Sequence, residues 1–354
     1  DGASTSSART EFEVTQSWRD APFRPAEFPP VDLDMSEDAD GTIRLTPKQA
    51  FAPLDGNVAR AFFTTAASKG ATSALAERGS DGEWVYTSFT GLAEQVRSAS
   101  QWLIDNLPRG SVLVVMAENS VAVAVMTMAA YATGTILCPI SPAYGVAGGD
   151  HARLRHVFDR TKPAAIFADP VPKYAEALAG IGSDARVITR DPAAFGGNAT
   201  AFADVVATPA TRAVDDAIAA IDPDAVAQYM MTSGSTGLPK VVEASLAALS
   251  ANTAAGVGLI GKAAGWDEDM LDWLPWHHTA GAGVLRAGLM LGGTLHIDAG
   301  KPAPGLFDRT IANLREVSVP YFNNVPLGFQ MLVDAMDGDT QLRDTFFRRM
   351  RLIL

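Results

Sequence analysis

Nine consecutive residues combine the side chains and the backbone freedom that proteins use to bind phosphate groups. The segment reads Thr232-Ser233-Gly234-Ser235-Thr236-Gly237-Leu238-Pro239-Lys240. Its glycines allow a turn in which several N–H groups face one anion, its hydroxyl groups add donors, and its lysine adds a positive charge. The composition favours a cradle for a polyphosphate, and a surface turn rich in glycine and serine is the alternative.

The residues on each side of the lysine distinguish this segment from the Walker A loop. Walker A requires glycine directly before the lysine and serine or threonine directly after it, whereas Pro239 and Val241 stand at those positions. Because proline fixes φ, the loop should not wind directly into a helix, and we expect Lys240 to lie on a stiff hairpin-like loop. The apolar run 225–231 predicts a buried strand before the loop, which favours the phosphate cradle over a plain turn.

Two adjacent histidines, His277 and His278, form a second candidate site. They follow an apolar run that begins at Leu271 and should lie at the end of a strand, where open α/β sheets bind ligands. Because adjacent strand residues point to opposite faces, we expect at most one of the two, His278, to contact a ligand. A buried histidine with a hydrogen-bond partner is the alternative. No Asp, Glu or His recurs at the spacing of metal ligands, so no protein metal site is expected.

Other aromatic and polar residues admit both a functional and a structural interpretation. Aromatic side chains, among them Trp273 and Trp276, could wall a pocket for an aromatic acid or fill a core. Asn323 and Asn324 could reach a ligand or shape a turn. The run 151–156, which holds two histidines and two arginines, is expected on a solvated helix face.

Composition and charge limit the classes of function. The chain has 354 residues, of which 47% are hydrophobic and 19% charged, as is typical of a soluble globular enzyme. A net charge of −12 argues against a nucleic-acid partner, because binding a polyanion requires clustered Lys and Arg. Cys138 is the only cysteine, so a reducing cytoplasm is the expected compartment and this thiol, in an apolar run, is expected to be buried and inert. No segment reaches the ~18 apolar residues of a membrane span, and no membrane partner is expected.

Strand-like and helix-like segments alternate along most of the chain. We expect strands at 112–116, 135–140, 164–168, 186–189, 225–231, 294–297 and 318–322, and another that begins at 351. Helices are expected at 88–107, 120–133, 173–179, 245–259, 283–291, 306–315 and 326–336, with one more that begins at 150. Such alternation indicates right-handed βαβ units and predicts an α/β fold of two mainly parallel sheets flanked by helices.

The same pattern predicts how the chain divides. Residues 1–45 are polar and rich in proline, and we expect an extended arm there. A first βα subdomain should cover 46–190 and a second one, with the phosphate loop, 225–354, each with its own sheet. Residues 191–224 lack a clear period and are expected to form an irregular connection with one short helix.

The loop 232–240 resembles the phosphate-binding signature of the adenylate-forming superfamily, which includes acyl- and aryl-CoA ligases. Neighbouring motifs resemble those of feruloyl-CoA synthases, and this resemblance runs from about residue 40 to the end of the chain. These motifs are Glu118-Asn119-Ser120, Pro139-Ile140-Ser141-Pro142-Ala143-Tyr144, Asp272-Trp273-Leu274-Pro275-Trp276-His277-His278-Thr279, Gly292-Gly293-Thr294-Leu295-His296-Ile297-Asp298, Gly300-Lys301-Pro302 and Tyr321-Phe322-Asn323.

The resemblance implies a reaction in two steps. The carboxylate of a hydroxycinnamic acid, such as ferulate, would attack the α-phosphate of Mg-ATP and release pyrophosphate, and the thiol of coenzyme A would then displace AMP. The loop residues and Lys240 would hold the β- and γ-phosphates and stabilise the leaving pyrophosphate. His278 would border the acyl pocket as the catalytic-site histidine, with Trp276 and Asn323 as further pocket residues. ATP, Mg²⁺ and coenzyme A are the implied cofactors, and a homodimer is one assembly left open.

Departures from the family pattern leave the acid open. Ala280 stands where a phenylalanine is frequent and would widen the pocket, and His277 replaces a common asparagine. The family's adenine-binding loop, its Tyr-Gly-x-Thr-Glu segment and its distal lysine are expected beyond Leu354. We therefore expect the N-terminal part of a longer enzyme, inactive as a 354-residue piece. A ligase for another aryl or fatty acid and a non-catalytic nucleotide- or partner-binding module are the alternatives.

Overall fold

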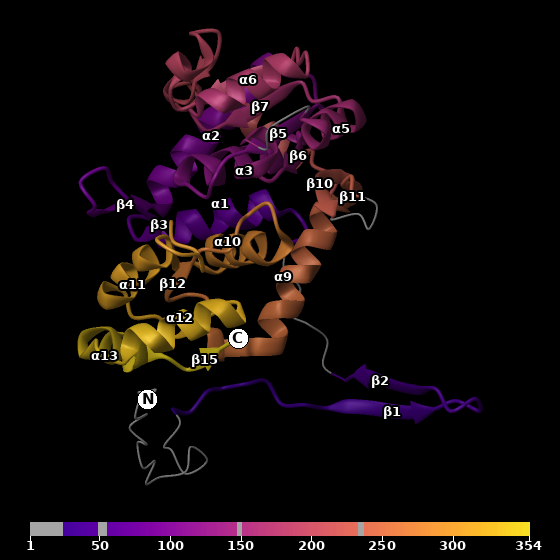
Figure 1. Ribbon diagram of the computed structural model, residues 1–354. Coiled ribbons are helices and arrows are strands. Elements are labelled where there is room, and N and C mark those ends of the chain that lie inside the picture. Colours follow the sequence, from indigo (N-terminus) through magenta and orange to yellow (C-terminus); the bar gives the residue numbers. More distant parts are fainter. Residues whose placement is uncertain (1–23, 49–54, 147–150, 233–236) are drawn as a thin grey trace, which may run out of the picture.

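The computed structural model describes residues 24–48, 55–146, 151–232 and 237–354 (Figure 1). Near the start of this part lies a hairpin of two antiparallel strands, β1 (Leu33–Glu37) and β2 (Ile43–Pro47), whose residues are all exposed. An extended arm was expected over 1–45, so the described end of that segment is more ordered than the prediction. The local turn at Asp38–Gly41 closes the hairpin, with the Gly41 N–H donating to the Asp38 carbonyl at 2.9 Å.

The larger sheet has seven strands in the order β11-β10-β6-β5-β7-β8-β9. Its strands are β5 (Val112–Met116), β6 (Ile136–Pro139), β7 (Ala165–Ala168), β8 (Arg186–Thr189), β9 (Thr200–Ala201), β10 (Val226–Thr232) and β11 (Lys240–Ser245). All neighbouring pairs are parallel except β10 and β11, which are antiparallel. The predicted parallel strands are therefore confirmed, and the edge of the sheet carries a hairpin.

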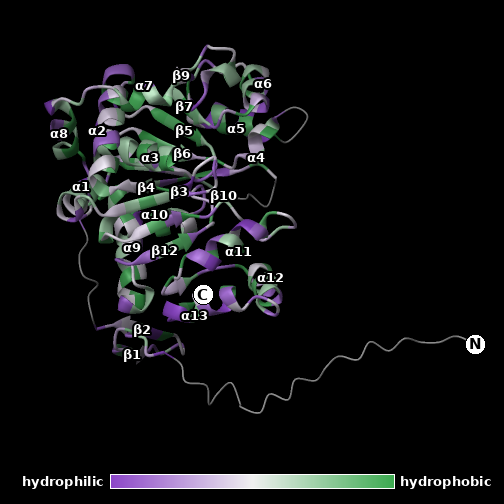
Figure 2. Cartoon of the chain, turned by 90° about the vertical axis from the view of Figure 1, so that its left-hand side faces the viewer, coloured by the Kyte–Doolittle hydropathy of each residue, from purple (hydrophilic) through white to green (hydrophobic). Residues whose placement is uncertain are grey.

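Helices cover both faces of this sheet, which explains why β5 is apolar at every position. Leu113 and Val115 belong to a core shared with α2 (Phe89–Asn106) and α3 (Val121–Thr133). Val112, Val114 and Met116 face the opposite core, formed with α5 (Ala152–Thr161) and α6 (Pro172–Gly180). A parallel strand buried on both faces reads as a continuous hydrophobic run. Figure 2 shows this hydrophobic colouring on β5, β6, β7 and α3.

Serine caps set the start of three helices. Ser88, Ser120 and Ser245 accept hydrogen bonds from backbone N–H groups in the first turns of α2, α3 and α9 (Leu246–Ile260). Gly134 ends α3 in the left-handed conformation with φ of 71°, which glycine adopts without steric cost. These boundaries agree with those expected from the sequence.

The second sheet has four strands in the order β12-β13-β3-β4. It contains β3 (Ser73–Arg78), β4 (Trp84–Ser88), β12 (Asp269–Asp272) and β13 (Thr294–Ile297). Between the two sheets lies one shared core, to which α1 (Val58–Lys69), α2, α3 and α10 (Thr279–Leu291) contribute.

The two sheets do not follow the predicted division of the chain at residue 225. β3 and β4 come from the predicted first subdomain but pair in one sheet with β12 and β13, whereas β10 and β11 extend the sheet of β5–β9. The chain passes between the two sheets through its helical connections. The hydrophobic periodicity of the sequence predicts single strands but not which strands pair. The prediction of one separate sheet for each subdomain is wrong.

The connection 191–224 contains more structure than expected. It forms a 3₁₀ turn η2 (Pro192–Phe195), strand β9, and helices α7 (Phe202–Val206) and α8 (Arg212–Ala219). Val214 and Ile218 of α8 pack into the core between the sheets. These elements are too short to produce a period that the sequence alone reveals.

A third core lies at the C-terminal side of the second sheet. It includes α11 (Phe307–Glu316), α12 (Pro326–Met336) and α13 (Thr340–Arg349), and beside it β14 (Tyr321–Phe322) pairs in parallel with β15 (Leu352–Ile353). The expected strand after residue 351 is thus present. Two shorter elements complete the described part, α4 (Ala143–Val146) and η3 (Gly261–Ala264). No helix in this part combines the length and the apolar character needed to cross a membrane.

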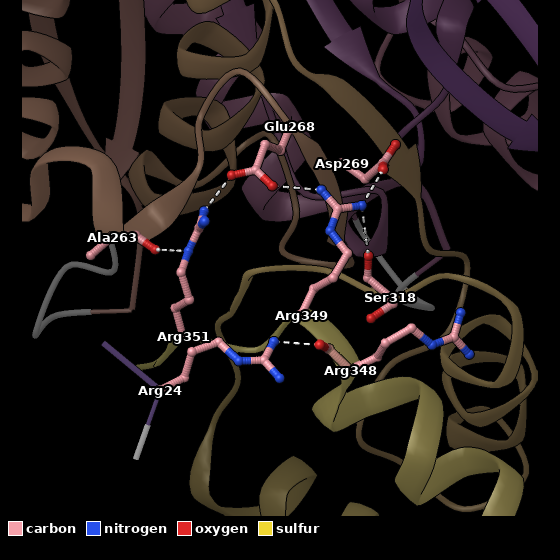
Figure 3. A network of polar contacts seen from close by, with 8 residues as sticks. All are labelled: Arg24, Ala263, Glu268, Asp269, Ser318, Arg348, Arg349 and Arg351. Atoms are coloured by element: carbon pink, nitrogen blue, oxygen red, sulfur yellow. Dashed lines mark hydrogen bonds and ion pairs between the residues drawn. The ribbon is translucent and has the colours of Figure 1, made fainter. Parts of the chain in front are cut away.

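Ion pairs attach the last described segment to the start of β12 (Figure 3). Arg349 contacts Glu268 at 2.6 Å and Asp269 at 2.7 Å, and Arg351 also donates to Glu268. Burial alone would raise the pKa of Glu268, but the hydrogen bonds from the two arginines outweigh burial and lower this pKa. The network fixes the position of β15 relative to the second sheet.

Candidate active site

The predicted phosphate loop connects β10 to β11. Thr232, the last residue of β10, pairs in register with Lys240, the first residue of β11. Antiparallel neighbours lie about 5 Å apart, so the pairing holds the two ends of the loop together. The predicted hairpin presentation of Lys240 is confirmed. Ser233, Gly234, Ser235 and Thr236, which were also predicted to bind phosphate, lie outside the described residues.

The described residues of the loop could contact an anion. Lys240 and Thr232 are both exposed, so that their side chains are accessible to a ligand. Gly237 has φ of +92°, a conformation that side-chain-bearing residues rarely adopt. This position needs glycine for the turn itself, whether or not a ligand binds.

Helix α5 supports the loop from the side. Nε2 of His156 lies 3.0 Å from the carbonyl oxygen of Pro239. Because a carbonyl oxygen can only accept a hydrogen bond, Nε2 must carry the proton in this contact. The prediction of a solvated helix face over 151–156 is wrong for His156, which is half-buried against the residue before Lys240.

The two histidines do not lie on a strand. β12 ends at Asp272, and the chain then turns, with the N–H of His278 donating to the Pro275 carbonyl at 3.0 Å. The imidazole rings of His277 and His278 are in contact, with centroids 4.3 Å apart. They do not point to opposite faces as predicted, because the alternation of a strand does not apply in a turn.

His278 precedes the first residue of α10 and is exposed. Next to it, the Thr279 hydroxyl contacts the sulfur of Met230 in β10 at 3.9 Å. Met230 lies two residues before Thr232. The structure therefore brings the start of α10 and the β10–β11 hairpin together, although they are about forty residues apart in sequence.

Asn119 clamps the turn that carries the aromatic and histidine residues. Its side-chain amide donates to the Leu274 carbonyl at 2.9 Å, and its side-chain oxygen accepts from the Trp276 N–H at 3.0 Å. Asn119 follows β5 in the motif 118–120, and the sequence analysis gave it no role. The two hydrogen bonds attach the turn to the carboxyl end of the larger sheet.

A cavity lies between this turn, α3, α10 and the larger sheet. Its volume is about 20 Å³, measured as the space open to the centre of a water molecule. Trp276 and His277 line it, together with strand residues such as Val115 and Leu137. Of the predicted pocket residues, Trp276 lines this cavity, whereas His278 and Asn323 are not among its described lining residues.

His277 is the histidine that faces the cavity. Burial, and to a smaller extent the neighbouring His278, lowers its pKa to about 4. The His277 imidazole is therefore neutral at physiological pH and can donate one hydrogen bond and accept another. Sequence spacing alone did not separate it from His278, because only the turn decides which ring is buried.

Asn323 and Asn324 follow β14, and the structure gives them different environments. The Asn324 side-chain oxygen accepts from the Trp273 indole N–H at 3.2 Å and from the Val325 N–H at 2.9 Å. Asn323 is half-buried. The role of Asn324 in fixing Trp273 and the turn after β14 agrees with the structural interpretation of this pair.

The deep end of the cavity carries polar groups that the sequence analysis missed. The hydroxyl of Tyr131 in α3 donates to the side-chain oxygen of Gln228 in β10 at 2.6 Å. Arg286 of α10 is only 2% exposed and lines the same cavity. Tyr131 and Arg286 lie in apolar helical segments and Gln228 in a strand, and none belongs to a motif, so only their convergence in space reveals them.

Metal ligands are not gathered in the described part of the chain. Within residues 24–48, 55–146, 151–232 and 237–354, no three His, Cys, Asp or Glu side chains converge in a way that could hold an ion. The one cysteine, Cys138, is buried in β6, and burial raises its pKa to about 12. A thiol with such a pKa is not a nucleophile.

Several solved structures resemble this fold. VinN in complex with L-aspartate is 18% identical, with a TM-score of 0.62 over 86% of this chain and 75% of that chain. ATP-bound MatB from Rhodopseudomonas palustris is 19% identical, with a TM-score of 0.63 over 85% and 54%. The A-PCP didomain of carboxylic acid reductase from Segniliparus rugosus, in complex with AMP, is 17% identical, with a TM-score of 0.63 over 84% and 48%.

These likenesses show that the chain shares the fold of these structures, and it spans about half to three quarters of their length. A comparison with curated proteins finds none that matches. The model of one protein family, described as AMP-binding enzyme, matches residues 62–353, which include the hairpin, the turn with the two histidines and the cavity. The chain belongs to the family of AMP-binding enzymes.

Proposed function

We propose that the protein activates a carboxylic acid with ATP and then transfers the acyl group to coenzyme A. The observation that carries the proposal is the meeting of three features at one edge of the larger sheet: the Thr232–Lys240 hairpin, the start of α10, and the mouth of a cavity. Membership of the AMP-binding enzymes supports a nucleotide at this edge. Carboxyl ends of parallel strands are where open α/β sheets bind ligands.

In the first step, a carboxylate oxygen of the acid attacks the α-phosphorus of ATP. The bond from that phosphorus to the bridging oxygen breaks, and pyrophosphate leaves with the bonding electrons. In this proposal Lys240 and the loop donors neutralise the charge that grows on the leaving group, which is usually the largest contribution that a protein makes to such a reaction. The hairpin fixes Lys240 relative to Thr232 before substrate binds, which reduces the entropy lost on the way to the transition state.

In the second step, the sulfur of coenzyme A attacks the acyl carbon and AMP leaves. The described residues form no cluster for Mg²⁺, so the ion is expected to be held by the phosphates and by groups outside the described part. Trp276 and the neutral His277 border the cavity in which the acid would lie. The resemblance of the motifs at 272–302 to feruloyl-CoA synthases supports a hydroxycinnamate, such as ferulate, as that acid.

The test is release of pyrophosphate by the full-length protein, measured with ATP, Mg²⁺ and a panel of acids. Pyrophosphate that depends on the acid, followed by a thioester when coenzyme A is added, is the expected result. Ferulate, benzoates and fatty acids in the panel identify the class of acid. Binding of ATP without any acid-dependent pyrophosphate or AMP would contradict the proposal and favour a non-catalytic nucleotide-binding module.

A further inference from the structure

Arg286 is a charged side chain in a place where charge is costly. It lies in the middle of α10, is 2% exposed, and is the largest of the fully buried side chains. Removing a guanidinium ion from water is unfavourable unless hydrogen bonds and an opposite charge compensate. Buried arginines are therefore expected to have partners.

Arg286 has only part of the compensation that it needs among the described residues: its side chain hydrogen-bonds to the Tyr131 phenol, which is a neutral partner. Its Nε and Nη2 atoms make no hydrogen bond there, and neither does Nε1 of Trp276, another buried residue that lines the same cavity. Nε and Nη2 form one edge of the guanidinium group, with two parallel N–H bonds. This edge matches two oxygen atoms held side by side, as in a carboxylate.

The cavity contains no opposite charge of its own. Its described lining includes no Asp or Glu. The side-chain oxygen of Gln228 already accepts from Tyr131. Burial raises the pKa of the Tyr131 phenol and nearby Arg286 only partly offsets this, so the phenol is neutral at physiological pH. The charge of Arg286 is therefore unbalanced unless a ligand supplies a negative group.

The cavity leads from the candidate active site towards Arg286. Asn119, Pro139 and His277 line it near the carboxyl ends of β5 and β6, and Tyr131 and Gln228 line it farther along. Gln228 lies four residues before Thr232 in β10, which corresponds to about 13 Å along a strand. An acid whose reacting carboxylate lies at the hairpin would extend its far end in the direction of Arg286.

We propose that Arg286 and Trp276 bind an anionic oxygen group at the far end of the acid and so select acids that carry one. This inference rests on the proposed function and specifies its substrate class. Dicarboxylic acids have the required charge, because their second carboxylate is ionised, whereas the ring oxygens of hydroxycinnamates are neutral at physiological pH and could only accept hydrogen bonds from these N–H groups. The narrow space favours a compact carboxylate, because about 20 Å³ exceeds the 10–15 Å³ that one water needs but is far below the ~150 Å³ of a cavity that holds benzene.

Matched pairs of acids test the proposal with the full-length protein. Dicarboxylates of four to eight carbons are compared with monocarboxylates of the same length, and ferulate and 4-hydroxycinnamate with cinnamate, which has no ring oxygen. The readout is kcat/KM for release of pyrophosphate. We expect each dicarboxylate to be used about 50-fold or more better than the monocarboxylate of the same length. A preference confined to ferulate and 4-hydroxycinnamate would show that the site binds a neutral oxygen and would overturn the proposal of an anion.

The variant Arg286→Met keeps most of the length of the side chain but removes its charge. In this variant the kcat/KM values of the two acids in a pair should differ by no more than about threefold. Arg286→Lys, which keeps the charge without the paired N–H bonds, should retain part of the preference. Arg309→Met, on the exposed surface of α11, is the matched control and should leave the ratio unchanged. The preferred acid should also raise the Tm of the wild-type protein but not of the Met variant.

Several outcomes would overturn the proposal. Equal kcat/KM values for both members of every pair in the wild-type protein would overturn it, and this result needs no variant that folds. An unchanged preference in a folded Arg286→Met variant would also overturn it. Stabilisation by chloride alone, with equal kcat/KM values for all pairs, would overturn it as well. If no acid yields pyrophosphate, the proposed function fails instead, and the Tm shift with the dicarboxylates still tests the binding of an anion at Arg286.

Discussion

Lys240 is the residue whose side chain chemistry most directly supports the proposed reaction. It is exposed at the start of β11, so its removal should leave the core intact. For Lys240→Ala we expect kcat for acid-dependent pyrophosphate release to fall about 10²–10³-fold, the usual cost of losing one charge-stabilising donor. The unfolding free energy should change by less than about 0.5 kcal/mol, as for other surface substitutions.

The control for this prediction is Lys173→Ala, which removes another exposed lysine from α6, away from the hairpin. It should change neither kcat nor stability. Lys240→Arg should keep part of the rate, because the charge remains. A Lys240→Ala enzyme with wild-type turnover would show that the hairpin does not act on the leaving phosphate.

At this scale the sequence identified residues that form a contiguous motif and missed those that converge only in space. Lys240 was placed correctly because Pro239 restricts the backbone locally. His277 was passed over in favour of His278, since the outcome depended on a turn closed by the Pro275 carbonyl. Arg286 gave no signal at all, because a single arginine in an apolar helix does not reveal whether it is exposed or buried.

Among the secondary-structure elements, α5 is expected to position the phosphate loop. Its His156 donates to the Pro239 carbonyl, next to Lys240. In His156→Ala the loop loses this support, and we expect the KM for ATP to rise about fivefold, with a stability loss of about 1 kcal/mol from one hydrogen bond. Steady-state kinetics with varied ATP and urea unfolding measure the two effects.

Arg153→Ala is the matched control on the same helix, because Arg153 is exposed. It should leave the KM for ATP unchanged. An unaltered KM in His156→Ala would mean that the hairpin is rigid without α5 and that the contact has only a structural role.

The turn between β12 and α10 depends on Asn119. Asn119→Ala removes two hydrogen bonds and leaves the Trp276 N–H and the Leu274 carbonyl without partners. We expect a loss of about 1–3 kcal/mol in unfolding free energy. The KM for the acid should rise more than the KM for ATP, because Trp276 and His277 border the cavity. Kinetics with each substrate varied in turn will separate the two.

Asn198→Ala, at an exposed position of the connection after β8, provides the control and should change neither constant. Equal increases in both KM values for Asn119→Ala would indicate a general loosening of the fold. Only a selective effect on the acid supports the assignment of the turn to the acid pocket.

Elements with a local signal were predictable, and those without one were not. Serine caps at 88, 120 and 245 and the glycine after α3 gave the correct helix boundaries because each acts within one turn. The elements between 191 and 224 were missed because their stability comes from packing, as when Val214 and Ile218 of α8 enter the central core. Short segments of this kind have no strong preference of their own.

For the whole molecule, the fold class followed from the alternation of strands and helices, but the pairing of the sheets did not. β3 joins β13 across more than two hundred residues, and α10 lies between two sheets whose strands come from both halves of the chain. This arrangement places Arg286 beside Tyr131, and no property of either segment alone specifies it. The proposed acid pocket therefore depends on the topology, whereas the β10–β11 hairpin, with the proposed phosphate loop, depends on local sequence.

The pH dependence of stability is a property of the whole molecule, and Asp272 should dominate it near neutral pH. Asp272 is buried at the end of β12, and its Oδ2 atom has no partner among the described residues. Burial, with a further contribution from Asp298, raises its pKa from 3.8 to about 8. Between these two values the folded protein holds a proton that the unfolded chain has lost, so the contribution of Asp272 to stability is greatest below pH 4 and falls as the pH rises to 8.

Other groups contribute elsewhere on the pH scale. His277 has a lowered pKa of about 4, so its contribution to stability increases with pH between about 4 and 6.5. In that range it partly cancels the decrease that Asp272 causes. Glu268, whose pKa is also lowered, stabilises the fold above its ordinary pKa, and that contribution is lost in more acidic solution. Tyr321, beside Asp272, has a pKa of about 12. Burial also raises the pKa of Asp298, whose contribution to stability likewise falls as the pH rises, so the contribution of Asp272 between pH 6.5 and 8 is measured as the difference between the wild type and a variant at position 272.

In that range the wild-type protein should lose up to about 2 kcal/mol of unfolding free energy, at about 1.4 kcal/mol per pH unit. Asp272→Asn keeps the shape of the side chain without the ionisation, so its stability should stay within about 0.5 kcal/mol across the range and exceed that of the wild type at pH 8. Urea unfolding at several pH values measures both. Asp267→Asn, at an exposed position nearby, should retain the wild-type slope. The same slope in Asp272→Asn would show that Asp272 is already ionised in the folded protein, with a counter-charge supplied from outside the described residues.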